Sequence, residues 1–492
     1  MAKEKEKREG WIVPAGEKWS YFIGSGSFMT AHTFISSFLS AYLLMIGVST
    51  SIAAIVLLAL KLFDSVNDVY FGYILDKVRF KAYTNKFLKW LFSGRYMPWF
   101  RLGTFVLPAS LLVMFTVNTS APVWIKITQY ALGYLLYDLG FTLISAPYNC
   151  TLMTITNNMD ERTFIQSYAT LGMGLGSLPV VFLGTAFVAG GFGYSGSAIV
   201  FSILGLVLAI PAMFFIKERN AHTDEVSEET QSQYTIKEMF RFLSKSKEFL
   251  FFELGQLAWG MFYTSGFLLF VAFYIFGDAN LSLIYMAIGV VPTIALIPFY
   301  PMIFKRISKM VCLRIVCVLF VVGSLAIYFM GPEGSTSAIG VHYIIYAVCS
   351  FAYSFVLIGS SMVLPDIAEV VKYRTNTERA GIIFSIHSFV TKMISSLVTS
   401  VSLLILGAYG YVSVMADSFE ELAALNEQGI GLQTARALEG LWDVTFLYPA
   451  IGFALAFVLF LLCKISRTDT EIMMKSNQGE ITREEAEALL SQ

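Results

Sequence analysis

Long apolar runs recur along the whole chain, separated by short polar or glycine-containing joints. A helix needs about 20 apolar residues to cross a bilayer. Twelve stretches meet this requirement, and they begin near Trp19, Ser49, Pro98, Ala121, Thr163, Gly193, Glu248, Leu281, Val311, Ala338, Gly381 and Leu441. Of the 492 residues, 56% are hydrophobic and 14% are charged, whereas a soluble domain has about 25% charged residues. The sequence therefore predicts an all-α membrane protein with twelve transmembrane helices.

Lysine and arginine are distributed unevenly between the two sides of these runs. Thirty of the 34 fall in the terminal segments and in the joints on the same side as the termini. The opposite side has only Lys126 and Arg436. Because basic residues concentrate in cytoplasmic loops, the pattern predicts a multi-pass protein of the plasma membrane with both termini in the cytoplasm.

The polar stretch KERNAHTDEVSEETQSQYTIKEMFRFLSKSK divides the runs six and six. We predict a cytoplasmic N-terminal segment (1–18), a six-helix bundle (19–216), a central cytoplasmic loop (217–247), a second six-helix bundle (248–466) and a cytoplasmic tail (467–492). Short surface helices are expected around SFEELAALNEQ in the outer joint 411–440 and in the tail, where Thr482 and Glu485 have capping-box spacing.

The second apolar run contains charged side chains at helical spacing. KLFDSVNDVYFGYILDK places Lys61, Asp64 and Asp68 on one helix face, with Asn67 beside it. A charge at mid-bilayer costs about 2.5–3.5 kcal/mol on insertion scales, so these groups must face a cavity, one another or an ion. A Lys61–Asp64 salt bridge would explain Lys61 but leave Asp68 without a partner. Two carboxylates and an amide are hard oxygen ligands, which predicts a site for Na⁺, Li⁺ or a proton.

The fourth run has a polar stripe of its own. Asp138, Thr142, Ser145 and Asn149 are spaced 4, 3 and 4 residues apart and share one helix face. Pro147 removes a backbone donor within the stripe and frees a carbonyl one turn earlier. Hydrogen bonding between helices is the alternative use of such residues. Four polar residues in register favour a polar cavity.

The eleventh run places Lys392 in mid-span, with His387 and Thr391 next to it. An intramembrane lysine is either a counter-ion for the carboxylates or a donor to substrate, and both uses stay open. His387 is more often a hydrogen-bonded packing residue than a proton carrier. The first run adds a weaker stripe that includes His32.

Two other motifs have simpler explanations than a catalytic or phosphate site. Gly172, Gly174 and Gly176 follow no predicted strand and lie in an apolar run, which favours close helix packing over phosphate binding. The segment TNNMDERTF, which includes Glu161, is interpreted as a solvated or gating charge cluster at a joint. The five cysteines show no metal-ligand spacing. We therefore expect neither an enzyme nor a bound cofactor.

Several motifs resemble, in order, those of the glycoside–pentoside–hexuronide:cation symporter family. This family belongs to the major facilitator superfamily and includes melibiose permease. The motifs are KLFDSVNDVYFGYILDK, GRYMPWF, TLISAPYNCTLMTITNNMDER and PDIAEVVKYRTNTERAGIIFSIHSFVTK, and ALEGLWDVTFLYPA fits the start of the last helix. The resemblance implies two six-helix bundles and cation-coupled transport. The joint VRFKAYTNKFLKWLFS is longer than is usual in the family.

The resemblance also assigns expected site residues. It implies cation ligation by Asp64, Asn67, Asp68 and Thr142, with Asp64 and Asp68 as the charged contacts to the ion. The expected substrate-binding residues are Lys392, His387, Ser145, Asn149, Tyr148, Met29, His32, Thr391 and Thr170, and the expected charge network is Lys61 and Asp138.

At the positions that bind sugar in melibiose permease, this sequence has different residues. The acidic residues of the permease on helices 1 and 4 are replaced here by Met29 and Ser145, its helix 4 tryptophan by Asn149, and its helix 5 arginine falls near Thr170. Because Lys392 is kept while two carboxylates are lost, an anionic substrate such as a uronide fits the sequence.

The resulting expectation is cation-coupled symport of a sugar, glycoside or uronide by alternating access. Its partners would be the small-molecule substrate, a monovalent cation (Na⁺, H⁺ or Li⁺) and the lipid bilayer, with no nucleic acid. A lipid or lysolipid symporter of the same fold and a membrane sensor that binds without transporting are the alternatives.

Overall fold

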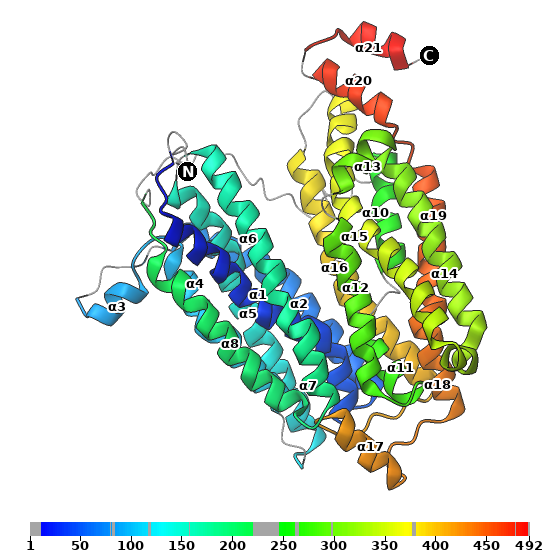
Figure 1. Cartoon of the computed structure of the whole chain (residues 1–492). Helices are drawn as coiled ribbons and strands as arrows, with labels where there is room; N and C mark the ends of the chain where they lie inside the picture. The colour runs from blue at the N-terminus through cyan, green and yellow to red at the C-terminus, as the bar shows by residue number, and fades with distance from the viewer. Residues whose placement is uncertain are drawn as a thin grey trace, which may run out of the picture. The chain divides into compact units, whose positions relative to one another are not determined.

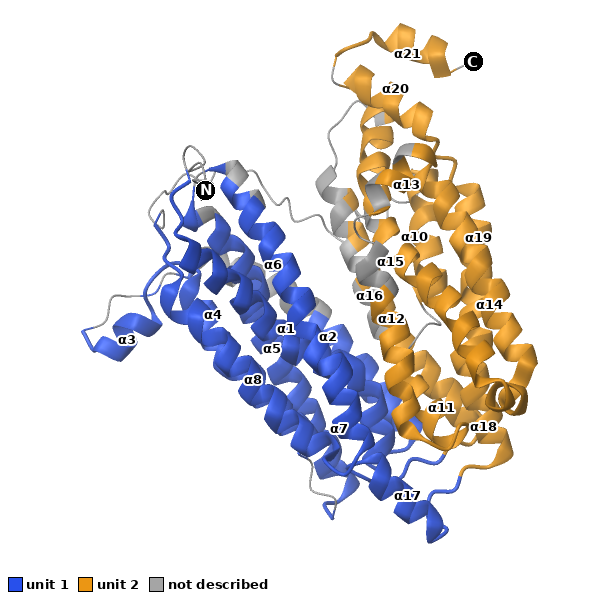
Figure 2. Ribbon diagram, in the orientation of Figure 1, with its two compact units in different colours: residues 1–227, 412–432 blue, residues 228–411, 433–492 orange. Residues whose placement is uncertain are grey.

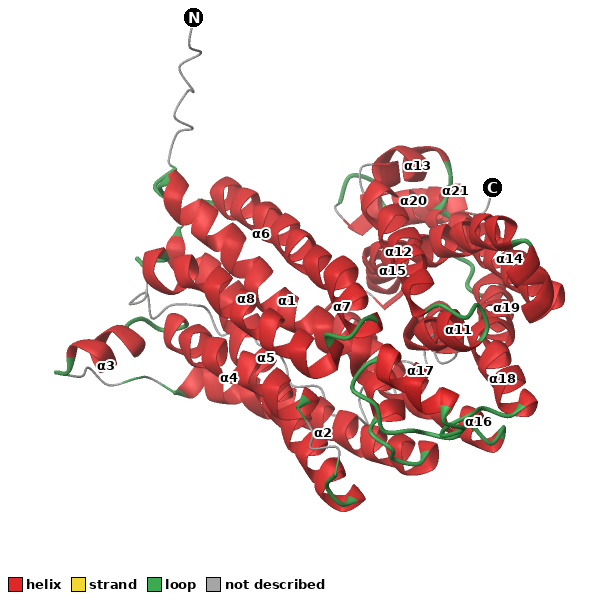
Figure 3. Ribbon diagram, turned by 60° about the horizontal axis from the view of Figure 1, so that its bottom comes forward, coloured by secondary structure: helices red, strands yellow, loops and turns green. Residues whose placement is uncertain are grey.

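The structure is a computed structural model. It describes residues 11–78, 80, 84–116, 120–156, 158–219, 246–260, 265–296, 299–375, 380–477 and 479–490. For some residues inside helices only the backbone is described, and these include Asn67, Asp68 and Lys392. The described residues are helices joined by loops (Figure 3).

The chain forms two compact units (Figure 2). Residues 1–227 and 412–432 make unit 1, and residues 228–411 and 433–492 make unit 2. The boundary falls within the polar stretch 217–247. Part of the 411–440 joint belongs to unit 1, although the sequence analysis placed the whole joint with the second bundle.

Unit 1 begins with a long helix and contains most of the predicted first bundle (Figure 1). Its helices are α1 (Ala15–Met45), α2 (Thr50–Lys77), α3 (Lys86–Leu91), α4 (Met97–Phe115), α5 (Val123–Ile155), α6 (Met159–Pro179), α7 (Thr185–Ala189), α8 (Gly193–Phe215) and α17 (Phe419–Glu427). A π-helical turn at Val180–Gly184 joins α6 to α7. Helix α8 begins at the residue expected from its apolar run.

Unit 2 has the same all-helical character. Its helices are α10 (Lys247–Gly260), α11 (Leu268–Tyr274), α12 (Ser282–Leu296), α13 (Tyr300–Arg306), α14 (Lys309–Ser337), α15 (Ile339–Thr375), α16 (Ala380–Ala408), α18 (Ala435–Trp442), α19 (Tyr448–Leu462), α20 (Arg467–Asn477) and α21 (Arg483–Leu490). Thr482 caps α21 by accepting from Glu485 N at 3.2 Å, and Glu485 Oε2 accepts from Thr482 N at 2.8 Å. The predicted capping box is confirmed.

Many helices expose large apolar side chains. Among the described residues, seven helical segments are long and apolar enough to cross a membrane. Segments such as 193–215 and 309–337 expose Ile, Val, Leu and Phe side chains, as lipid-facing helices do. The count of twelve spans stays a prediction.

The glycines of the sixth helix serve close packing. A Cβ at Gly176 would collide with the backbone of Gly26 on α1, and one at Gly172 would collide with the Phe22 carbonyl. At this crossing Thr30 donates its hydroxyl to the Gly176 carbonyl at 3.0 Å. For Gly172 and Gly176, the interpretation as a packing motif is confirmed.

Residues 412–432 dock onto unit 1 at the start of α8. Ala416 N donates to the Met45 carbonyl at 2.9 Å, and Tyr194 N donates to the Asp417 carbonyl at 2.8 Å. The Asp417 carboxylate accepts from Ser195 N at 3.2 Å and from Ser195 Oγ at 2.8 Å. Gly193 has φ of +67°, and a Cβ there would lie 2.5 Å from Asp417 Oδ2. The expected helix in this joint is confirmed as α17.

Candidate substrate and cation site

A polar cluster forms in unit 1 where α2 packs along α5. Asp64 of α2 is partly exposed, and its Oδ2 accepts from the Tyr134 hydroxyl of α5 at 3.5 Å. Asp64 also lies close enough to Lys61 and His32 to interact with both electrostatically. The carboxylate therefore has basic and hydroxyl neighbours from three helices.

An aromatic and hydrogen-bonding surface adjoins this carboxylate. His32 Nδ1 shares a hydrogen bond with the Tyr137 hydroxyl at 2.7 Å. The His32 ring stacks on Phe141, with centroids 4.5 Å apart and planes 23° apart. The sequence analysis did not single out Tyr137 or Phe141. Both residues could have been found from the sequence, because the aromatic residues at 134, 137 and 141 are three and four positions apart, as the residues of the polar stripe are.

The four polar residues of α5 differ in burial. Asp138 is 4% exposed and Thr142 is 6% exposed. Ser145 is half-buried and Asn149 is exposed. The stripe thus runs from the interior of unit 1 to an open surface, and Asp138 is near enough to Tyr134 to interact electrostatically.

Three other expected substrate residues have different surroundings. Met29 is partly exposed on α1, and Thr170 is exposed on α6 with its hydroxyl bonded to the Gln166 carbonyl at 3.1 Å. Tyr148 is fully buried; its ring stacks on Tyr21 with centroids 4.3 Å apart, and each hydroxyl donates to the other residue's carbonyl. This arrangement favours a packing role for Tyr148.

Half of the expected cation ligands lie outside the described side chains. Asn67 and Asp68 continue α2 beyond Asp64, and Lys392 lies in α16, but only their backbones are described. The structure brings Asp64 and Thr142 onto neighbouring helices α2 and α5. Cation ligation by the full set of four stays a prediction.

Unit 2 contains a buried acidic residue that sequence reasoning missed. Glu253 of α10 is 2% exposed, and its Oε1 lies 3.0 Å from Nδ1 of His387 on α16. Gln256, one turn later, is 3% exposed and accepts from Trp259 Nε1 at 2.9 Å. Thr391 is exposed and donates to the His387 carbonyl at 2.9 Å. The sequence pointed to Glu253 only through a single Glu in an apolar run, followed by Gln three residues later.

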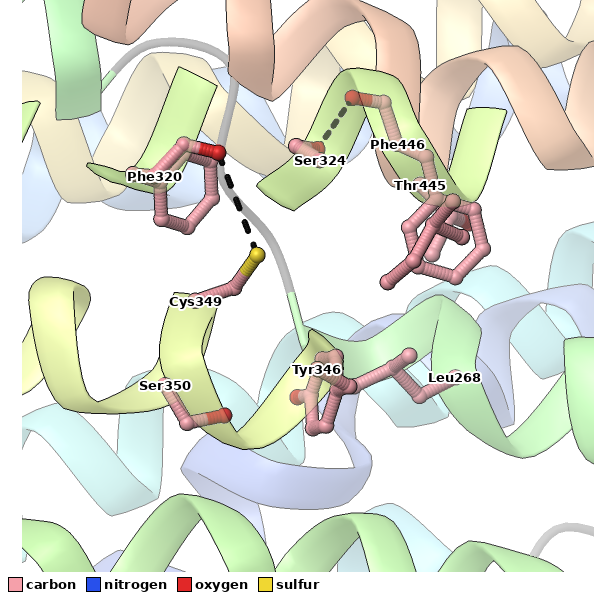
Figure 4. Close-up of a pocket in the computed structure, with 9 residues that line it drawn as sticks. Leu268, Phe320, Ser324, Tyr346, Cys349, Ser350, Thr445 and Phe446 are labelled. Carbon is pink, nitrogen blue, oxygen red and sulfur yellow. Dashed lines mark hydrogen bonds between the residues drawn. The ribbon is translucent and has the colours of Figure 1, made fainter. Parts of the chain in front are cut away.

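A small cavity also lies inside unit 2 (Figure 4). Its volume is about 20 Å³, and it is lined in part by Ser350, Thr445 and Cys349. Ser324 donates to the Phe446 carbonyl at 2.6 Å, and Cys349 Sγ faces the Phe320 carbonyl at 3.8 Å. A space of this size holds one water molecule, so this cavity does not fit a sugar.

The TNNMDERTF segment has a buried carboxylate at its centre. Glu161 is fully buried, and it accepts from the backbone N–H groups of Ile12 and Val13, both at 3.1 Å, and from the Thr156 hydroxyl at 2.9 Å. Lys18 Nζ lies 2.7 Å from Glu161 Oε1. The solvated alternative is wrong for Glu161, because Ile12 and Val13 of the N-terminal segment contact the buried carboxylate, and the gating alternative stays a prediction.

A second carboxylate, Glu17, forms an ion pair at the same end of unit 1. Glu17 at the start of α1 pairs with Arg219, whose Nη1 and Nη2 donate to Oε1 and Oε2 at 2.9 and 2.5 Å. Lys217 N donates to the same carboxylate at 3.0 Å. The beginning of α1 is thus tied to the segment that follows α8.

The fold matches that of known membrane transporters. The crystal structure of the nucleoside transporter NupG superposes with a TM-score of 0.62 at 12% identity, covering 91% of this chain and 99% of that one. The chain therefore shares the all-helical fold of this transporter.

Sequence comparison gives the family. The profile of the MFS/sugar transport protein family matches residues 20–467, and the chain belongs to this family. It is a multi-pass membrane transporter of the major facilitator superfamily and not an enzyme.

Similar proteins cover nearly the whole chain. The uncharacterized symporter YnaJ of Bacillus subtilis (strain 168) is 25% identical over 473 residues, which are 93% of this chain and 92% of that protein. The isoprimeverose transporter of Lactiplantibacillus pentosus is 23% identical over 481 residues, 95% and 92% of the two chains. The glucuronide carrier protein homolog of Escherichia coli (strain K12) is 24% identical over 410 residues, 81% and 83% of the two chains.

Proposed function

We propose that the chain is a cation-coupled symporter of a sugar, a glycoside or a uronide that works by alternating access in the plasma membrane, with both termini in the cytoplasm. Membership of the sugar transport family supports the substrate class. The observation that carries the coupling is Asp64, an ionisable group inside the α2–α5 packing of unit 1. Ionisable residues within transmembrane segments mark ion and substrate pathways.

Asp64 is proposed as a ligand of the coupling cation, together with Asn67, Asp68 and Thr142. Carboxylate, amide and hydroxyl oxygens are hard ligands that suit a small monovalent cation or a proton. Lys61 is a basic neighbour of Asp64, so a cation that binds Asp64 competes with it. Lys61 and Asp138 then form the charge network that changes when the cation enters or leaves.

His32, Tyr137 and Phe141 are proposed as part of the substrate surface. A sugar ring has apolar C–H faces and hydroxyl edges, which match an aromatic face beside hydrogen-bonding groups. Phe141 and the His32 ring supply the face, and the His32–Tyr137 pair supplies the polar groups. Met29 and Ser145 lie on the same two helices, α1 and α5, as this surface.

Both neutral and anionic sugars fit this proposal. One relative is named for isoprimeverose and another for glucuronide. Lys61 is a basic neighbour of Asp64, which also lies near His32, and Lys392 of α16 is proposed separately as a basic substrate residue. A uronide carboxylate would then take the place of the protein carboxylates that Met29 and Ser145 replace.

The test is thermal unfolding of the purified chain against glycosides, uronides and lysolipids, with and without Na⁺ or Li⁺ and at two pH values. A ligand at 100 times its Kd stabilises by about 2.7 kcal/mol. We expect one sugar-type ligand to raise the unfolding temperature, and one cation to enlarge that shift. A shift caused by lysolipids alone would overturn the substrate class. A sugar shift that no cation or pH change alters would overturn the coupling and favour a sensor.

A further inference from the structure

Helix α3, in the long joint after α2, packs on the surface of unit 1. Asn85 caps α3 by accepting from Phe87 N at 2.9 Å. Arg101 of α4 donates to the Ser93 carbonyl just beyond α3 at 2.9 Å and to the Met213 carbonyl of α8 at 3.2 Å. The Trp90 ring stacks on Phe214 of α8, with centroids 4.8 Å apart and planes 17° apart. Helix α3 is therefore fixed against α4 and α8.

Helix α3 borders an open groove at the end of unit 1 where α8 ends. The groove lies between α3, α4 and α8, has a volume of about 640 Å³, and is lined mainly by apolar side chains, among them Phe87, Trp90, Phe105, Val207 and Phe214. Phe87, Phe105 and Phe214 are each at least half exposed. The volume falls within the range of small-molecule sites. An open apolar groove of this kind takes up apolar chains.

The rim of the groove is basic. Lys86 lines it, and Lys89 lies one turn further along α3, next to Lys86 and outside the lining. Both lysines are exposed. Among the described residues that line the groove there is no carboxylate. A cationic rim above an apolar floor complements a molecule with an anionic head and an apolar tail.

We propose that this groove is a binding site for an anionic phospholipid. Its phosphate contacts the ammonium groups of Lys86 and Lys89, and one acyl chain lies along Phe105, Val207 and Phe214. Basic residues next to aromatic side chains at the end of a transmembrane bundle hold anionic headgroups. The proposal accounts for the extra length of the joint and does not depend on which sugar or cation is transported.

The binding test uses the full chain in detergent with phosphatidylglycerol or phosphatidylcholine, read by native mass spectrometry. A double variant, Lys86→Gln with Lys89→Gln, removes the basic rim. The matched control, Lys464→Gln with Lys475→Gln, removes two exposed charges from unit 2. One surface lysine changes anionic-lipid binding about fivefold. We expect wild type and control to prefer phosphatidylglycerol, and the rim variant to lose on the order of twentyfold in that preference.

A second measurement locates the lipid and separates binding from misfolding. Phosphatidylglycerol with a photoreactive acyl chain should label the segments of α4 and α8 that contain Phe105 and Val207. Val207→Trp, which fills an exposed position of the groove, should abolish that labelling without lowering the unfolding temperature in neutral detergent. Equal lipid preference in the rim variant, labelling elsewhere, or a dimer that forms through the groove and is lost in Val207→Trp would each overturn the proposal.

Discussion

Glu161→Gln tests whether a buried carboxylate holds the N-terminal segment onto unit 1. The side chain accepts from Ile12 N on one oxygen and from Val13 N on the other, and it pairs with Lys18. Glutamine keeps the shape but replaces one acceptor oxygen by a donor amide. The variant therefore loses the ion pair and places an amide against one backbone N–H.

The expected cost follows from these contacts. A hydrogen bond to a charged group contributes about 1.5–3 kcal/mol, and removing one member of a buried ion pair costs about 3–5 kcal/mol. Lys18 keeps 13% exposure of its side chain, while Glu161 has none, so solvent weakens the pair modestly. Glutamine retains one backbone acceptor. We expect a loss of about 3 kcal/mol, which is roughly a 100-fold increase in local opening.

Hydrogen exchange at the Ile12 and Val13 amides measures this opening directly. Glu427→Gln is the control, because Glu427 is exposed on α17. We expect faster exchange at the two amides in Glu161→Gln and unchanged exchange in the control. Protection of both amides within a factor of three of wild type would refute the reasoning, because the carboxylate would then not hold the segment.

The same contact has a definite pH dependence. Burial by itself raises the pKa of Glu161, but the hydrogen bonds from Lys18, Ile12, Thr156 and Val13 outweigh it and hold the pKa below its usual value of 4.5. A carboxylate whose pKa is lowered by folding stabilises the folded state fully at pH values above its unfolded-state pKa. This stabilisation is lost as the pH falls through its folded-state pKa. Protection of the Ile12 amide should therefore be constant above about pH 5.5 and decrease below pH 4.5.

Three further predictions concern unit 1. Asp417→Ala removes the acceptor of Ser195, and we expect glutamyl endopeptidase to cut residues 412–432 at least tenfold faster, whereas an unchanged rate would show that the backbone contacts suffice. Gly193→Ala places a Cβ at a positive φ against Asp417, and we expect about 1–2 kcal/mol of destabilisation, measured as a lower unfolding temperature relative to Gly174→Ala, where the space is open. Tyr137→Phe removes the partner of His32; the KM for sugar should rise several-fold while stimulation by the cation persists, and an unchanged KM would remove Tyr137 from the substrate surface.

The helices could be predicted from the sequence because their signal is local. Apolar runs gave the start of α8 at Gly193, and capping-box spacing gave the helix after Thr482. The packing function of Gly172 and Gly176 was also readable, since neither follows a strand and both lie in an apolar run. These inferences need only residues that are close together in the chain.

The parts that failed depend on residues far apart in the chain. Glu161 looks solvated beside Asp160 and Arg162 in the sequence, but Ile12 and Val13, about 150 positions earlier, donate their backbone N–H groups to it. The docking of Asp417 on Ser195 joins positions 222 apart. The side chain of Glu253 was overlooked because a single acidic residue has no periodicity, and its partner His387 lies on another helix.

Cation-driven uptake into proteoliposomes tests the central claim most directly. Wild type, Asp64→Asn and the exposed-site control Glu427→Gln would be given the ligand found by thermal unfolding, with an inward gradient of Na⁺, Li⁺ or H⁺ imposed in turn. The account predicts that one gradient drives accumulation in wild type and control, and that Asp64→Asn exchanges substrate without accumulating it. Accumulation by Asp64→Asn under the same gradient, or by wild type with no cation gradient, would contradict it.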